Sequence, residues 1–291
     1  MTRVSWYKPF IKRVWWKRQL LDQFYDNHYY PESFNEYYEP FVWGWAVFFH
    51  LRNIYWNKFK AHLFDINEEL VNLYNVIKKD TDNLIKELKI FQKKNSKEFY
   101  LWIRAWDREP DYMKKRSPVE RSARFMYLNR TWYNWLRRVN SQWYNNVPYW
   151  KYINPRICDE EWLYNTKKAL VNTTIKVSDF QKAVKNAREW DFVYFDPPYD
   201  PLNKTSSFTD YAKNWFWDDD QKRLWNCFRE LNNRGCYVVA SNNKTDLIKE
   251  IYKPFRIETV KAKRAVNSDA SKRWAIDEAV ILSDKIKKCQ K

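Results

Sequence analysis

Glycine is nearly absent from this chain. The 291 residues include 2 Gly and 18 Trp, whereas an average globular protein has about 7% Gly. Cysteine is also scarce, and the four cysteines lie far apart without a CxxC pair, which indicates neither a zinc site nor a disulfide framework. No apolar run approaches the roughly 20 residues of a membrane-spanning helix, and the N-terminal segment lacks the apolar stretch of a secretory signal. We therefore expect a globular, cytoplasmic protein without a metal site.

Acidic residues are outnumbered by basic ones. The chain has 53 Lys and Arg against 36 Asp and Glu, a net charge of +17. Residues 121–156 contain no Asp or Glu at all, and their Arg and Lys are interleaved with Tyr, Trp and Asn. Basic side chains bind phosphates, and aromatic rings stack on bases. A solvated basic surface would show the same charge bias, but the interleaved aromatics favour a nucleic-acid partner.

Strand-like and helix-like segments alternate along the chain. Segments of helical period, such as 67–91 and 218–234, separate short apolar runs. This alternation is typical of an open α/β sheet, which binds ligands at the carboxyl ends of its strands. Residues 71–170 break the pattern, so we expect an inserted module there and a catalytic domain made of 1–70 and 171–291. The apolar runs of strand length are YYEPFV near 37, KAHLFDI at 60, IKVSDF at 175, DFVYFDPPY at 191, CYVVASN at 236 and DEAVIL at 277.

The segment DFVYFDPPYDPL, residues 191–202, carries the strongest chemical signal. An apolar strand delivers Asp196 to its carboxyl end, and Pro197 and Pro198 then stiffen the turn and remove two backbone donors. A carboxylate and a proline carbonyl accept the two N–H bonds of an exocyclic amino group, and the ring of Tyr199 stacks on a planar base. An ordinary strand-to-loop turn is the alternative interpretation. The motif therefore predicts a site for an amino-bearing base.

Further motifs extend almost end to end, in a fixed order. The chain resembles the Dam-like (class alpha) DNA adenine-N6 methyltransferases, particularly the GATC-specific enzymes of DpnII-type restriction-modification systems. This resemblance implies a Rossmann-like S-adenosylmethionine-dependent methyltransferase sheet with an inserted, mainly helical target-recognition domain. The motifs that carry it are PFIKRVWWKRQLL (9–21), EPFVWGWAVFF (39–49), FDIN (64–67), NSKEFYLWIR, RVNS, NVPYWKYINP, KVSDF, DPPYDPLNKTSSFT and SNNKTDLI.

Many tryptophans stand where that family typically carries glycine. Such positions need a backbone that adopts φ > 0 or approaches a ligand closely, and an indole permits neither. We hypothesise that most of these tryptophans are encoded by UGA, which one variant genetic code reads as Trp and another as Gly. Real substitution in a decaying gene is the alternative. The positions are Trp15, Trp16, Trp43, Trp45, Trp135, Trp150, Trp190 and Trp274.

The resemblance also implies a set of contacts to S-adenosylmethionine. Lys17 pairs with the methionine carboxylate, and Asp65 accepts hydrogen bonds from the ribose hydroxyls. Residues 39–45 form the loop under the cofactor. Arg13 stands where the family has Trp, which leaves that contact open. The implied cofactor-binding residues are Arg13, Lys17, Glu39, Pro40, Phe41, Gly44, Asp65, Asp179, Phe180 and Asp196.

Catalysis and target recognition are assigned in the same way. Asp196, Pro197, Pro198 and Tyr199 are the implied catalytic residues, which act on an adenine flipped out of double-stranded DNA. Arg138 reads a guanine edge, and Leu136 contacts a thymine methyl group. The implied DNA-binding residues are Tyr133, Asn134, Leu136, Arg138 and Pro148.

Two rival functions remain open at this point. An RNA adenine methyltransferase would use the same Asp-Pro-Pro-Tyr chemistry. A DNA-binding pseudoenzyme would have lost its cofactor as the loop filled with Trp. We expect a monomer, with a cognate restriction endonuclease as a possible partner.

Overall fold

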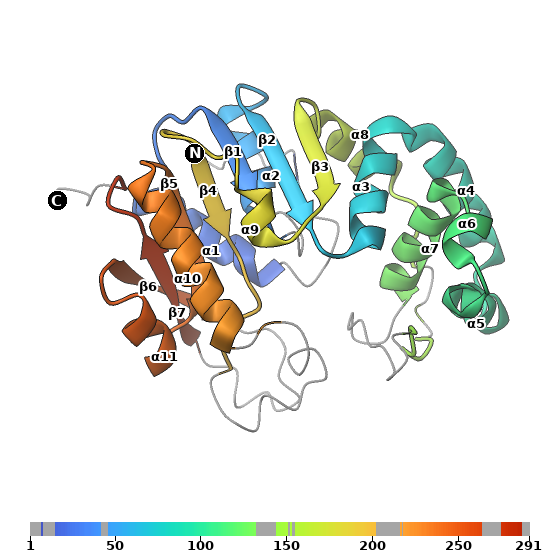
Figure 1. The fold of residues 1–291 in the computed structure, drawn as a ribbon. Coiled ribbons are helices and arrows are strands. Elements are labelled where there is room, and N and C mark those ends of the chain that lie inside the picture. The colour runs from blue at the N-terminus through green and yellow to red at the C-terminus, as the bar shows by residue number, and fades with distance from the viewer. Residues whose placement is uncertain are drawn as a thin grey trace. The chain divides into compact units, whose positions relative to one another are not determined.

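The computed structural model describes residues 7, 15–41, 46–131, 144–150, 152, 155–201, 216, 218–263 and 275–286, with only the backbone given for 15–19, 218, 262–263 and 275–276. The described residues form two compact units (Figure 1). The sheet unit comprises residues within 14–66 and 172–291, and the helical unit comprises residue 7 and residues within 67–171.

The sheet unit contains a seven-stranded sheet of order β3-β2-β1-β4-β5-β7-β6. Strands β1 to β5 pair in parallel, and β7 pairs antiparallel with both β5 and β6. The order 3-2-1-4-5 is that of Rossmann-like sheets, so the expected α/β fold is confirmed. The strands are β1 (Glu36–Glu39), β2 (Lys60–Asp65), β3 (Thr173–Val177), β4 (Phe192–Phe195), β5 (Tyr237–Asn243), β6 (Arg256–Lys263) and β7 (Ala275–Leu282).

Six of these strands fall on the predicted apolar runs, and β6 was missed. Its sequence, RIETVKAK, mixes charges with few apolar residues. Because β6 lies at the edge of the sheet, most of its described side chains are partly or fully exposed. An edge strand of this kind lacks the apolar run on which a sequence prediction depends.

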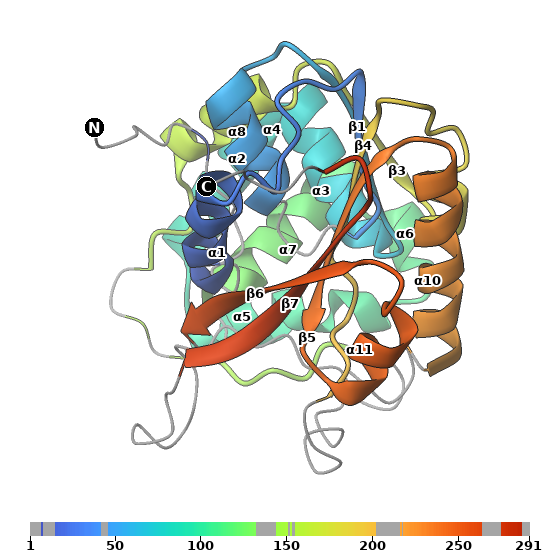
Figure 2. The same cartoon turned by 90° about the vertical axis from the view of Figure 1, so that its left-hand side faces the viewer.

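Helices cover both faces of the sheet (Figure 2). Helices α1 (Trp15–Asp26) and α2 (Ala46–Tyr55) lie on one face, and α10 (Asp218–Asn233) and α11 (Asp246–Ile251) lie on the other. Helix α9 (Phe180–Ala183) packs against α10. All four residues of β4 are buried, as expected for a parallel strand with both faces covered. The ring of Tyr194 points toward the α1 side, where it meets Phe24, while Val193 and Phe195 join the core under α10.

The helical unit is organised around α7 (Pro118–Thr131), which packs against α3 (Glu68–Lys79), α4 (Thr81–Lys94) and α5 (Lys97–Ala105). The predicted helical segment 67–91 forms α3 and α4, which are separated at Asp80. Asn67 starts α3 because its side chain caps the first free N–H groups. The unit also contains the short helices η2 (Trp106–Arg108) and α6 (Tyr112–Lys115), and α8 (Glu160–Ala169). None of the helices in the described part of the chain is long and apolar enough to cross a membrane.

Two tryptophans occupy left-handed backbone positions. Trp56, with φ of 54°, directly follows the end of α2, and Trp190, with φ of 69°, precedes β4. Both indoles are about half exposed, at 54% and 49%. Helix ends and tight turns of this kind normally use Gly, which has no Cβ to clash. Trp190 is among the positions where the family resemblance implies Gly, and the backbone conformation at Trp56 favours Gly there as well.

Candidate active site

The acidic site residues gather at the carboxyl edge of the parallel strands. Strand β1 pairs with β2 on one side and with β4 on the other. When both registers are extended past the end of β1, Phe41 lies level with Asp65 at the end of β2 and with Asp196 after β4. Asp65 and Asp196 are both 9% exposed. The strand order thus brings three segments that are far apart in sequence to one edge.

Glu39 is a third buried carboxylate at this edge. It ends β1 and is 2% exposed, and the hydroxyl of Tyr37 donates a hydrogen bond of 2.8 Å to its Oε2. Burial, together with the nearby Glu39, raises the pKa of Tyr37 well above its ordinary value. Tyr37 therefore stays protonated and keeps the Glu39 carboxylate in a fixed orientation. Such a carboxylate suits a positively charged or hydroxyl-bearing ligand.

An aromatic pair lies next to these carboxylates. The rings of Phe41 and Phe180 stack with their centroids 5.4 Å apart and an interplanar angle of 27°. The guanidinium of Arg223 lies 4.9 Å from the Phe180 centroid and binds Asp179 Oδ2 at 3.1 Å. Asp179 Oδ1 also accepts a hydrogen bond from the backbone N–H of Gln181 and so caps α9. The cofactor role of Asp179 and Phe180 stays a prediction beside these structural contacts.

Side chains from β5 and α10 hold the loop that contains Asp196. The carboxamide of Asn242 accepts a hydrogen bond from the Asp200 N–H at 2.9 Å, and the side chain of Asn243 donates to the Asp200 carbonyl at 2.5 Å. Gln221 donates to the Pro198 carbonyl at 3.3 Å and accepts a hydrogen bond from Asn242 at 3.2 Å. Both sides of the loop are therefore anchored to regular secondary structure.

The Pro197 carbonyl differs from the Pro198 carbonyl in its hydrogen bonding. Within the described residues no donor reaches the Pro197 carbonyl, whereas the Pro198 carbonyl accepts a hydrogen bond from Gln221. The Asp196 carboxylate and the Pro197 carbonyl are both hydrogen-bond acceptors, and they lie on the same short segment. This is the pairing that the Asp-Pro-Pro-Tyr motif predicts for an amino group.

Tyr199 is tied to a different part of the sheet. Its hydroxyl donates a hydrogen bond of 3.0 Å to Oε2 of Glu278 in β7. Burial and the carboxylates of Asp196 and Glu278 raise its pKa well above the ordinary value for tyrosine, so the hydroxyl remains a donor at neutral pH.

The sequence did not single out the four residues that hold this loop, which are Gln221, Asn242, Asn243 and Glu278. The run SNN at the end of an apolar strand was one available signal, because a buried strand rarely ends in three polar side chains without hydrogen-bond partners. Glu278, inside the apolar run DEAVIL, was another.

Several predicted site residues fall outside the described part of the chain. They are Arg13, Gly44, Tyr133, Asn134, Leu136 and Arg138. Lys17 lies in α1, where only the backbone is described. Pro148 is exposed in the helical unit, and the preceding carbonyl, that of Val147, accepts hydrogen bonds from Tyr100 at 2.7 Å and from Arg104 at 2.8 Å.

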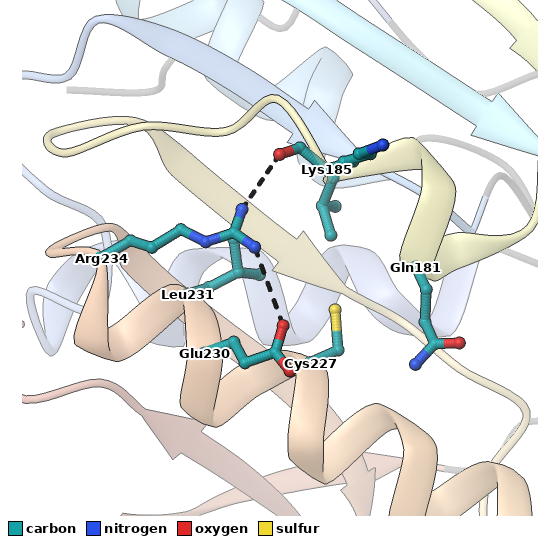
Figure 3. A pocket seen from close by; sticks show the side chains of 7 residues that line it. Gln181, Lys185, Cys227, Glu230, Leu231 and Arg234 are labelled. Atoms are coloured by element: carbon teal, nitrogen blue, oxygen red, sulfur yellow. Dashed lines mark hydrogen bonds and ion pairs between the residues drawn. The ribbon is translucent and has the colours of Figure 1, made fainter.

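A small cavity lies between α9 and α10, away from these strand ends (Figure 3). Its volume is about 130 Å³, below the roughly 300 Å³ of small-molecule sites. Gln221, near the start of α10, contacts the Asp196 loop, whereas the cavity residues of α10 lie toward its other end. Arg234 closes one side through a hydrogen bond of 3.0 Å that it donates to the Lys185 carbonyl. The lining residues are Gln181, Val184, Lys185, Cys227, Glu230, Leu231 and Arg234.

Comparison with known proteins identifies the family. The family model for D12 class N6 adenine-specific DNA methyltransferases matches residues 16–266. The chain is 43% identical over 276 residues to the Type II methyltransferase M1.LlaDCHI of Lactococcus lactis subsp. cremoris, which covers 94% of each chain. It is 42% identical over 282 residues to the Type II methyltransferase M.MjaIII of Methanocaldococcus jannaschii, covering 91% of this chain and 95% of the relative. It is also 31% identical over 247 residues to the DNA adenine methylase of Escherichia coli strain K12, covering 84% of each. The chain therefore belongs to the D12 class of N6 adenine-specific DNA methyltransferases.

Proposed function

We propose that this chain transfers a methyl group from S-adenosylmethionine to N6 of adenine within GATC in double-stranded DNA. The observation that carries the proposal is the buried Asp196 at the carboxyl end of β4, followed by a Pro-Pro-Tyr loop anchored on both sides.

The loop would act on an adenine that has left the duplex, because its N6 atom is out of reach inside the base stack. Hydrogen bonds from N6 to Asp196 and to the Pro197 carbonyl would localise the nitrogen lone pair, which is otherwise delocalised into the ring. Tyr199 would stack on the base and hold it in line with the methyl donor. Alignment and carboxylate stabilisation of the positive charge that develops on the nitrogen supply most of the acceleration.

The described residues at the strand ends fit S-adenosylmethionine. Glu39 and Asp65 supply carboxylates for its hydroxyl and cationic groups, and Phe41 and Phe180 supply an aromatic surface for its adenine. Lys17 would pair with its carboxylate group. When bound, the cofactor supplies an activated methyl group. Arg13, Pro40, Gly44 and Asp179 complete the proposed set.

We assign target recognition to the insertion, residues 71–170. Its segment 121–156 has no acidic residue, which suits contact with phosphates. Arg138 would form two hydrogen bonds with a guanine edge, worth about 1 to 3 kcal/mol of discrimination. Tyr133 and Asn134 would lie beside the flipped base, and Leu136 and Pro148 would complete the contact surface.

Two of the relatives are named Type II methyltransferases. We propose on this ground that the chain acts in a restriction-modification system, with a cognate endonuclease that cuts the same sequence. Within such a system methylation protects the host DNA. We further propose that the chain acts as a monomer.

The proposal is tested by transfer of labelled methyl from S-adenosylmethionine to a GATC duplex, with a GTTC duplex as control. The parent chain, with Trp43 and Trp45, is compared with the double variant Trp43→Gly/Trp45→Gly. We expect label on GATC only, and more of it with the glycines present, because an indole in that loop would occupy cofactor space.

The other outcomes separate the alternatives. Label on an adenine in another sequence would reject GATC but keep the chemistry. Binding of DNA without label in either version would identify a pseudoenzyme. Preferential labelling of tRNA or rRNA would identify an RNA enzyme.

A further inference from the structure

The carboxylate of Glu278 lies where an apolar strand residue would be expected. It belongs to β7, between β5 and β6, and its register partners are Asn243 on one side and Val260 on the other. Glu278 is 2% exposed and is followed by four buried residues, 279–282. Burying a carboxylate costs several kcal/mol unless it is well paired, so fold stability alone does not explain a glutamate here.

Its contact is with the candidate catalytic loop. Glu278 Oε2 accepts the hydrogen bond of the Tyr199 hydroxyl at 3.0 Å, across 79 residues of sequence. Asn243, the register partner of Glu278, also binds this loop, through the Asp200 carbonyl. Strand β7 and the end of β5 therefore contact neighbouring residues of the same loop, Tyr199 and Asp200.

The two ends of this hydrogen bond differ in rigidity. Glu278 is in a strand that is paired on both sides, whereas Tyr199 is in a loop. Fixing the hydroxyl oxygen of a tyrosine at the far end of the ring restricts χ1. Because a phenolic O–H bond lies near the plane of its ring, an acceptor fixed in space also favours one value of χ2. The strand thus sets the orientation of the ring.

We propose that Glu278 is a positioning residue, which holds the Tyr199 ring in the plane on which the flipped adenine stacks. This rests on the proposed role of the Asp-Pro-Pro-Tyr loop. Glu278 does not touch the base, and it acts on the base through the Tyr199 hydroxyl.

The test compares Glu278→Ala, Glu278→Gln, Tyr199→Phe and the double variant Glu278→Ala/Tyr199→Phe. Tyr199→Phe keeps the stacking ring and removes the tether. Glu278→Gln keeps an oxygen that accepts the hydrogen bond. Glu258→Ala is the matched control, because Glu258 lies on the neighbouring strand β6 and pairs with Arg256 at 3.7 Å.

We expect Glu278→Ala and Tyr199→Phe each to lower kcat by about tenfold through loss of alignment, with KM for DNA little changed. The double variant should be no slower than the slower single variant, because both changes remove the same interaction. Glu278→Gln and the Glu258 control should stay near the parent. Multiplying effects in the double variant, or a Glu278→Ala enzyme that behaves like the control, would overturn the proposal.

A second readout does not depend on turnover. A duplex with 2-aminopurine at the target adenine becomes fluorescent when the base leaves the stack, and stacking on a tyrosine ring quenches it. Glu278→Ala should bind this duplex as tightly as the parent but give brighter emission, and Glu278→Gln should not. Unchanged emission in Glu278→Ala would contradict the positioning role. Failure to label GATC would count against the proposed function and not against the positioning role, because the fluorescence comparison needs only a bound duplex and no methyl transfer.

Discussion

Replacing Trp56 by Gly should stabilise the protein. Trp56 has a φ of 54°, and holding a residue with a Cβ in this left-handed region costs about 1 to 2 kcal/mol. Glycine removes that cost but has more freedom in the unfolded chain, which offsets about 0.5 to 1 kcal/mol. The indole is 54% exposed, so its removal forfeits little burial. We expect a net gain of about 0.5 to 1 kcal/mol.

Trp190 provides an instructive comparison. Its φ of 69° predicts the same relief, but its ring also holds the Lys285 ammonium 3.3 Å from the centroid. Loss of that cation–π contact costs about 0.5 to 1 kcal/mol. Trp190→Gly should therefore be close to neutral, and less stabilising than Trp56→Gly.

Thermal unfolding monitored by circular dichroism measures these differences, since 1 kcal/mol corresponds to a Tm shift of roughly 2 to 4 °C for a protein of this size. Trp56→Ala is the decisive control, because alanine keeps the Cβ and hence the strain. Trp102→Gly serves as the opposite control, since Trp102 is 52% exposed inside helix α5, where glycine costs about 1 kcal/mol. The strain argument fails if Trp56→Ala stabilises as much as Trp56→Gly, or if Trp56→Gly lowers Tm. Sequencing the gene gives an independent check, because UGG codons at Trp190 and the other positions where the family carries Gly would reject the recoding hypothesis.

Further predictions concern pH, the loop and the cofactor. Burial raises the pKa of Tyr37 and of Tyr194 well above 10. The stability that these two protonated side chains contribute is therefore fully present below pH about 10. As the pH rises further, the free energy of unfolding falls by up to about 1.4 kcal/mol per pH unit for each group. Denaturant unfolding between pH 9 and about 11 should show this slope, and a flat profile would contradict it. Gln221→Leu removes the hydrogen bond to the Pro198 carbonyl and should lower kcat about tenfold without changing cofactor affinity; equal losses in both would assign Gln221 a general structural role instead. Arg223→Gln breaks its contacts with Asp179 and with the Phe180 ring, and should raise the Kd of S-adenosylmethionine about fivefold, or 1 kcal/mol. Calorimetry measures this Kd, and an unchanged value would show that Asp179 and Phe180, at the start of α9, do not contact the cofactor.

Much of this protein could be predicted from the sequence because its signals are local. Apolar runs bounded by polar residues located six of the seven strands, and the edge strand β6 was missed because its pattern is mixed. The motif around Asp196 needed only one strand, two prolines and one ring to suggest its chemistry. Family motifs then extended that interpretation to the whole chain.

Only the tertiary structure decided which distant residues meet that motif. The strand order inserts β7 between β5 and β6, and this alone brings Glu278 to the Tyr199 hydroxyl. Gln221 reaches Pro198 because α10 begins at the carboxyl edge of the sheet. The left-handed backbone at Trp56 likewise depends on how α2 ends and the chain turns toward β2. Such contacts depend on strand order and packing between segments far apart in the chain, and no local pattern of residues records them.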